Sequence, residues 1–353
     1  MKRKDFIRLK AGLLCQGVKT TPESREAMVR EYPNFFDKGL IDAANINIYG
    51  SNLCVNANEN FAKNSPYTLV YEEGKFSITG GAEPVTVKFF DSLPKTDTIL
   101  DKIARLHAEK TINIWPSTAC CYDVDGKKCA FCSLEKTAPE PLDLDYMAGA
   151  LKKLLEGVPD FTLNFSGGTF KSPDHMARYW LELVKRIREF SNCPIAIELA
   201  PPTDLSLLDE LKAAGLNVII MNLEVADENL RKQICPGKSS ITKEHYYKAF
   251  RRVVELFGWG QVSSVLIGGI QPKEDIINEI EEMAKIGVFP TIMPFRPVDG
   301  CALRNNPTCD PDELVEMSEI LGGLLRKYNL KPYLQEGCTK CGGCSIENDC
   351  FVI

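Results

Sequence analysis

The sequence predicts an α/β protein whose main part is a partial or full (β/α) barrel. Six short runs between residues 111 and 295 are apolar on both faces, as strands buried in a parallel sheet are, and stretches with helical periodicity alternate with them. Right-handed crossovers curl such units into a barrel. The expected strands are 111–116, 161–165, 194–199, 217–224, 261–268 and 288–295, and the expected helices are 143–157, 173–190, 204–214, 242–257, 273–286 and 311–327.

The first 110 residues predict a β-rich N-terminal wing without a cofactor motif. One helix is expected at 22–29, and strands between Gly, Asn and Pro turns are expected at 46–49, 67–71, 75–78 and 85–90. We favour a wing that pads the barrel over one that recognises a partner. The chain should then divide into an α+β wing (1–110), a barrel core (111–328) and a cysteine-rich tail (329–353).

The composition indicates a cytosolic protein with a substantial core. Of the 353 residues 44% are hydrophobic, and no apolar run has the length of a membrane span. The basic start at Met1 to Phe6 is not followed by the apolar stretch of a signal peptide. A net charge of −6 argues against nucleic-acid binding as the main function. We therefore expect neither nucleic acid nor membrane among the partners.

Fourteen cysteines are the sharpest compositional feature. A reducing cytosol disfavours a disulfide framework, so metal binding or catalysis explains them better, and exposed clusters would suit an anaerobic source. Seven of them form two groups, and the default for the others is a small buried hydrophobe. These others are Cys15, Cys54, Cys120, Cys193, Cys235, Cys301 and Cys309.

The first group follows the expected strand 111–116. Cys121, Cys129 and Cys132 can hold three irons of a 4Fe–4S cluster and leave the fourth iron open for chemistry, at the strand end where barrels place their active sites. Cys120 is an alternative first ligand, and a zinc knuckle is an alternative site. The loop resembles the signature of the radical S-adenosylmethionine (SAM) superfamily, with the aromatic Phe131 before the last Cys. It departs from the usual spacing, which has three residues between the first two Cys.

Further motifs resemble the same superfamily. Ser166-Gly167-Gly168 ends the second expected strand and matches the Gly-Gly-Glu motif, which implies a backbone clamp on the SAM amino group, although Thr169 replaces the acid. Glu198 and Glu224 close apolar strands, where an unpaired carboxylate is costly, and this indicates ligand-facing roles. Resemblance to the biotin-synthase-like branch implies the remaining SAM contacts. These are Glu224 and Lys238, with Arg231 as the alternative cation, and Ile270 or Val298 against adenine.

Two residues near the sixth strand are candidates for substrate contact. Arg296 lies at a strand mouth, either as a handle for an acidic substrate group or in an internal salt bridge to Glu198 or Glu224. Cys301 replaces the Thr usual in the biotin-synthase-like branch and is expected to face the mouth of the barrel.

The tail carries the second cysteine group. Cys338, Cys341, Cys344 and Cys350 have nearly ferredoxin spacing, and the intervening glycines let the loop bend around a second 4Fe–4S cluster, with zinc as the alternative. In the radical SAM superfamily such an auxiliary cluster is either consumed as a sulfur source or relays electrons.

The resemblance is to the biotin synthase, lipoyl synthase and hydrogenase maturase branch. It implies two 4Fe–4S clusters, a ferredoxin or flavodoxin donor, and SAM cleavage to a 5′-deoxyadenosyl radical that abstracts hydrogen from an unactivated carbon. We lean towards sulfur insertion of lipoyl-synthase type, with a lipoyl carrier protein or a second radical SAM protein as partner. The alternatives are a radical enzyme acting on a small nitrogenous metabolite and a non-enzymatic metal carrier.

Overall fold

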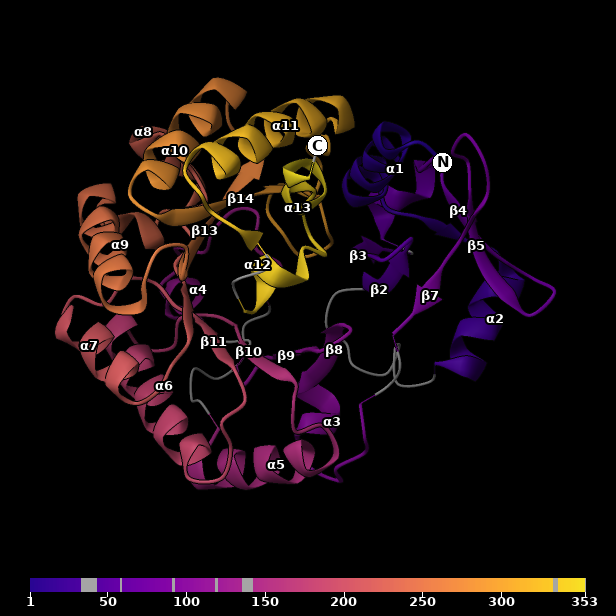
Figure 1. The fold of residues 1–353 in the computed structure, drawn as a ribbon. Helices are drawn as coiled ribbons and strands as arrows, with labels where there is room; N and C mark the ends of the chain where they lie inside the picture. The colour runs from indigo at the N-terminus through magenta and orange to yellow at the C-terminus, as the bar shows by residue number, and fades with distance from the viewer. Residues whose placement is uncertain are drawn as a thin grey trace.

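The largest element of the computed structural model is a seven-stranded sheet that curves into a partial barrel (Figure 1). The structure describes residues 1–32, 43–57, 59–90, 93–117, 120–134, 142–332 and 336–352. The order is β14-β13-β12-β11-β10-β9-β8, and every pair is parallel except β8 with β9. The six predicted parallel strands are confirmed. The strands are β8 (Ala104–Ala108), β9 (Thr111–Ile114), β10 (Thr162–Phe165), β11 (Ile195–Glu198), β12 (Val218–Ile220), β13 (Val262–Gly268) and β14 (Val288–Pro294).

Helices cover the outer face of this sheet (Figure 1). The six predicted helices are confirmed. Polar side chains cap several of them: Ser172, Thr242 and Asp310 each accept a hydrogen bond from a backbone N–H of the first turn. The outer helices are α5 (Leu144–Gly157), α6 (Pro173–Arg188), α7 (Ser206–Ala213), α9 (Lys243–Phe257), α10 (Lys273–Lys285) and α11 (Pro311–Lys327). The short helices α3 (Leu100–Ile103), α4 (Cys121–Val124) and α8 (Glu228–Ile234) were not predicted.

The N-terminal wing contains two small sheets, of order β1-β4-β5-β6 and β3-β2-β7. The strand predicted at 85–90 is divided, because its first part pairs with β5 and its last part with β2. Helix α1 (Arg3–Gln16) was not predicted, and it packs against α11 and β3. The other elements are α2 (Pro22–Glu31), β1 (Lys19–Thr20), β2 (Ala43–Ile48), β3 (Ser51–Asn56), β4 (Thr68–Glu72), β5 (Lys75–Thr79), β6 (Val85–Thr86), β7 (Lys88–Phe89) and a 3-10 helix (Asn60–Asn64).

Strand β8 connects the wing to the barrel. It lies within the range expected for the wing, yet it pairs with β9 as the edge of the main sheet, and the Asn45 side chain of β2 donates a hydrogen bond to the backbone of Leu106. One hydrophobic core runs from α1 through the barrel to α11. The wing and the barrel therefore fold around shared buried surface.

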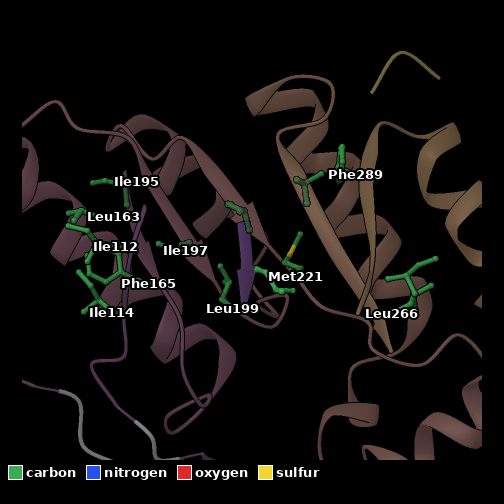
Figure 2. Packing of buried hydrophobic residues seen from close by; sticks show 14 of the residues in the cluster. Ile112, Ile114, Leu163, Phe165, Ile195, Ile197, Leu199, Met221, Leu266 and Phe289 are labelled. Atoms are coloured by element: carbon green, nitrogen blue, oxygen red, sulfur yellow. The ribbon is translucent and has the colours of Figure 1, made fainter. Parts of the chain in front are cut away.

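Alternate residues of each strand point to opposite faces of the sheet. Ile195 and Ile197 belong to the large core under the outer helices, together with Leu163 and Phe165 of the next strand (Figure 2). Ala196, between the two isoleucines, points to the concave face and belongs to a separate buried group.

The C-terminal tail, with α12 (Cys338–Cys341) and α13 (Glu347–Phe351), enters this concave face. A Cβ on Gly337 would lie 2.7 Å from the Cβ of Ala196, so only glycine fits there. Glu336 accepts a hydrogen bond of 2.9 Å from Thr162 Oγ1 at the start of β10. The tail thus occupies the interior of the barrel near the amino ends of its strands.

None of the helices in the described ranges combines the length and apolarity that a bilayer crossing needs.

Candidate SAM and iron–sulfur site

The loop of the first cysteine group lies against the glycine loop that follows β10. The backbone N–H of Cys121 donates to Thr169 O at 2.7 Å. Gly167 has a φ of 145°, and a Cβ there would lie 2.4 Å from the Ser117 carbonyl oxygen. A side chain at Gly167 would therefore separate the two loops, which explains why the sequence has glycine at this strand end.

The far side of the same loop is held by the segment after α8. Ala130 N donates to Ile234 O at 2.7 Å, and Gly237 N donates to Lys127 O at 3.0 Å. The Tyr122 ring packs on Gly237, where a Cβ would lie only 2.6 Å from the ring. These contacts position the loop across the carboxyl ends of the strands.

The loop cysteines affect one another's ionisation. The pKa of Cys120 is lowered to about 6, first by a hydrogen bond from Cys121 and then by neighbouring backbone N–H groups. A hydrogen bond from Cys235 lowers the pKa of Cys129, and burial raises the pKa of Cys132 to about 11. The charge of Cys120 also opposes ionisation of both Cys129 and Cys132.

The sequence left Cys120 and Cys121 open as the first ligand, and of the two Cys120 is the one whose pKa is lowered. The pKa of Cys121 is raised, first by its hydrogen bond to Cys120 and then by burial and by the charges of Cys120 and Asp125. Three thiols that repel one another's charge are a donor set that a cationic iron cluster stabilises. Cys235 was expected only as a buried hydrophobic residue, but its side chain forms a hydrogen bond with Cys129. Nothing in the sequence near Cys235 indicates this contact.

The predicted acids and Lys238 meet at the ends of β11 and β12. Lys238 Nζ lies 2.8 Å from Glu224 Oε1, and both side chains are nearly buried. Asn222 Nδ2 donates to Glu198 Oε1 at 2.7 Å. Burial, and then the charge of Glu224, raises the pKa of Glu198 to about 7. The strand ends thus hold two carboxylates against one ammonium group.

Glu224 has a φ of 70°, in the left-handed region that a glutamate rarely adopts. Hydrogen bonds fix this conformation: Glu224 N donates to Val265 O at 2.9 Å, while its carbonyl oxygen accepts from Ile267 N and from Gln271 Nε2. Strained backbone of this kind clusters at ligand sites.

Arg231 is not available as the alternative SAM cation. Its guanidinium group donates to the backbone carbonyl oxygens of Leu223, Lys238 and Ile241, and it lies over the Tyr246 ring. Only 2% of the residue is exposed. Its donors are directed to the backbone, so its role is to position the loop that carries Lys238.

A cavity of ≈ 280 Å³ opens beside these groups. Phe131, Cys132, Glu224, Val298 and Arg296 are among the residues that line it, and much of the remaining lining is aliphatic or aromatic. The predicted adenine contact Val298 therefore faces the cavity.

Three other predicted contacts lie differently. Ile270 packs on the apolar cluster that lines the cavity, and Cys301 is fully buried in that cluster. The Cys301 thiol is therefore enclosed next to the cavity and is not exposed at the barrel mouth. Arg296 pairs with neither predicted acid; its Nη1 donates to Asn56 Oδ1 at 2.9 Å and to Cys54 O at 3.3 Å, which ties the cavity to β3.

Two of the tail cysteines lie in different surroundings. Cys350 is 1% exposed in the main core, where the α13 backbone lies close to Gly322 of α11. Cys344 lies instead near Cys54 of β3 and His107 of β8. The side chain of Cys338 lies outside the described residues.

Fold and site together define an α/β partial-barrel protein with a cysteine-rich loop and a cavity at the carboxyl ends of its strands. Residues 120–290, just under half of the chain, match the model of the radical SAM superfamily, and this range includes strands β10 to β13 of the barrel. The methylornithine synthase PylB has the same fold, with a TM-score of 0.50 and 19% identity over 62% of each chain.

Two curated relatives align over part of the chain. One is the bacteriochlorophyllide c C-7(1)-hydroxylase of Chlorobaculum limnaeum, 35% identical over 136 residues, which are 38% of this chain and 34% of the relative. The other is an uncharacterized protein of Methanocaldococcus jannaschii, 26% identical over 133 residues, which are 36% of this chain and 34% of the relative. The chain spans about a third of the length of the curated relatives it matches.

Proposed function

We propose that this protein cleaves SAM reductively and uses the resulting radical to abstract hydrogen from a substrate carbon held in the barrel mouth. The observation that supports this best is the meeting of three features at one place: the cysteine loop, the Glu198, Glu224 and Lys238 group, and a cavity that Cys132 and Glu224 both line. A ligand in this cavity would touch the cluster loop and the buried charges together.

The residues present fit a 4Fe–4S cluster and SAM. Cys120, Cys129 and Cys132 would hold three irons, and the cluster with SAM would supply the 5′-deoxyadenosyl radical. Ser166, Gly167 and Gly168 would offer backbone groups to the SAM amino group at the strand end. Buried acids are suited to SAM because it carries positive charge on its amino and sulfonium groups.

The cavity suits a substrate with an apolar reactive part. Val265, Ile267 and Phe295 supply apolar lining, while Asn56 and Arg296 supply hydrogen-bond donors at the side next to β3. The relative from Chlorobaculum limnaeum is named as a hydroxylase of bacteriochlorophyllide c. A ferredoxin or flavodoxin would serve as the electron donor.

The sulfur insertion that the sequence suggested needs a second cluster that can be consumed. The described tail cysteines give that role no support, because Cys350 lies in the core while Cys344 lies beside Cys54 and His107. We therefore propose hydrogen abstraction without sulfur donation from the tail.

The test is anaerobic reconstitution followed by SAM and dithionite, with 5′-deoxyadenosine as the product measured. We expect Cys129→Ala and Cys120→Ala to lose about four irons per chain and all cleavage. Cys121→Ala and the buried Cys193→Ala serve as matched controls and should keep both. A wild-type protein that holds the cluster but forms no 5′-deoxyadenosine would overturn the proposal.

A further inference from the structure

Three metal-binding side chains converge inside the barrel, and none of them is among the residues that line the cavity. The Sγ atoms of Cys54 and Cys344 and a ring nitrogen of His107 all lie within 4.8 Å of one another. Cys54 comes from β3, His107 from the edge strand β8 and Cys344 from the tail, so the group joins three parts of the chain that are far apart in sequence. Cys54 and His107 are each only 8% exposed.

A fourth thiol lies against the same histidine. Cys341 Sγ is 3.2 Å from His107 Nδ1, and the residue is 6% exposed. The backbone supports this placement, because Cys54 N donates to Gly343 O at 2.7 Å and Asn52 Nδ2 donates to Cys341 O at 2.9 Å. The tail loop is thus fastened along β3 with both of its thiols directed at the histidine region.

We propose that Cys54, His107, Cys341 and Cys344 bind one zinc ion. Three thiolates and one imidazole are a common ligand set of structural zinc. Zn–S bonds of ~2.3 Å place tetrahedral sulfur ligands about 3.8 Å apart, which is compatible with the observed grouping. A 4Fe–4S cluster holds each thiolate on a different iron and spreads the thiolates further apart. The ligand set also differs from the ferredoxin-like tail pattern, because it omits Cys350 and includes a histidine.

The ion would be structural and would also border the cavity. Asn56, which lines the cavity, is two residues from Cys54 and on the same face of β3, about 7 Å further along the strand. Arg296, also in the lining, donates to Cys54 O. Zinc would therefore fasten the wing and the tail to the edge of the sheet and fix one wall of the substrate cavity. This inference does not depend on the proposed function, since zinc takes no part in SAM cleavage.

Metal analysis of protein purified anaerobically from zinc-supplemented cells tests the site. We expect about one zinc and about four irons per chain in the wild type. Cys54→Ser, His107→Ala and Cys344→Ser should each lose zinc at least tenfold and keep about four irons. Cys350→Ala is the matched control, because it would remove a ligand from a four-cysteine cluster but should leave zinc in place.

Several outcomes would overturn the proposal. These are about eight irons with no zinc, loss of metal in Cys350→Ala, and a wild type without zinc. Should the ligand variants fail to fold, zinc-edge X-ray absorption of the wild type decides: sulfur at about 2.3 Å with one nitrogen at about 2.0–2.1 Å supports the site, and an oxygen-only shell refutes it. SAM cleavage measured on the same samples separates this result from failure of the proposed function.

Discussion

The ion pair between Lys238 and Glu224 can be tested by its contribution to stability. Lys238→Met would leave Glu224 buried without its partner, 2.8 Å from where the ammonium group had been, and close to Glu198. Breaking a buried pair from one side costs about 3–5 kcal/mol, because the remaining charge is desolvated and unmatched. We expect this loss in the free energy of unfolding of Lys238→Met, measured by urea denaturation.

The loss should depend on pH. Burial and the charge of Glu224 raise the pKa of Glu198 to about 7, and Lys238 partly offsets that rise. Without Lys238, the repulsion between the two carboxylates is relieved only when one of them takes up a proton. The loss in free energy of unfolding of Lys238→Met should therefore be larger at about pH 8 than at about pH 6.

Two further variants complete this test. The double variant Glu224→Gln/Lys238→Met removes both charges and should recover most of the stability. Lys248→Met, in an exposed pair with Glu244, is the control and should cost less than about 1 kcal/mol. If Lys238→Met costs no more than this control, the pair is not a buried one and the reasoning is refuted.

Three other predictions follow from buried groups. Arg231→Met removes donors to three backbone carbonyl oxygens and should lower the free energy of unfolding by about 3 kcal/mol, whereas the exposed Arg178→Met should change it by less than about 0.5 kcal/mol. Gly167→Ala should weaken SAM binding at least tenfold in equilibrium dialysis, because the Ser117 carbonyl oxygen blocks the new methyl group; unchanged affinity would show that the loop adapts. Burial raises the pKa of Glu347 to about 7, so the folded state keeps a proton that the unfolded state loses from about pH 4.5 upward, and stability should fall as pH rises through that window. The free energy of unfolding of Glu347→Gln, measured at several pH values, should not show this decrease. Equal pH dependence in the wild type and in the variant would contradict the raised pKa of Glu347.

Much of the barrel could be predicted because its signals are local. Six apolar runs, whose residues face the outer helices and the inside of the barrel in turn, predicted the strands. Capping residues such as Ser172 and Asp310 predicted where helices begin. The wing was harder. Helix α1 has buried residues on much of its surface, since it packs between α11 and β3, so it lacks a clear polar face. The run 85–90 looks like one strand but serves two sheets.

The candidate SAM site was predictable in its residue types and less so in their roles. Cys129 stands in a short cysteine motif and Glu224 follows an apolar run, and such positions are visible in a sequence, whereas Lys238 was named only from the resemblance. The role of Arg231 was not visible, because only the folded chain brings three carbonyl oxygens to its guanidinium group. The burial of Cys301 was not visible either, because only the folded chain places it in the apolar cluster that lines the cavity.

The amino-acid sequence by itself determined the fold class and the cysteine loop, because hydrophobic periodicity and ligand spacing act within a few residues of the chain. Only the tertiary structure decided which distant groups meet. His107 is one of just three histidines, and it stands in an edge strand with no neighbouring ligand in sequence. Cys54 and Cys344 lie far from it along the chain, and the pairing of β8 with β9 and the entry of the tail into the barrel bring them together. Spacing cannot reveal a site whose ligands are assembled by chain topology.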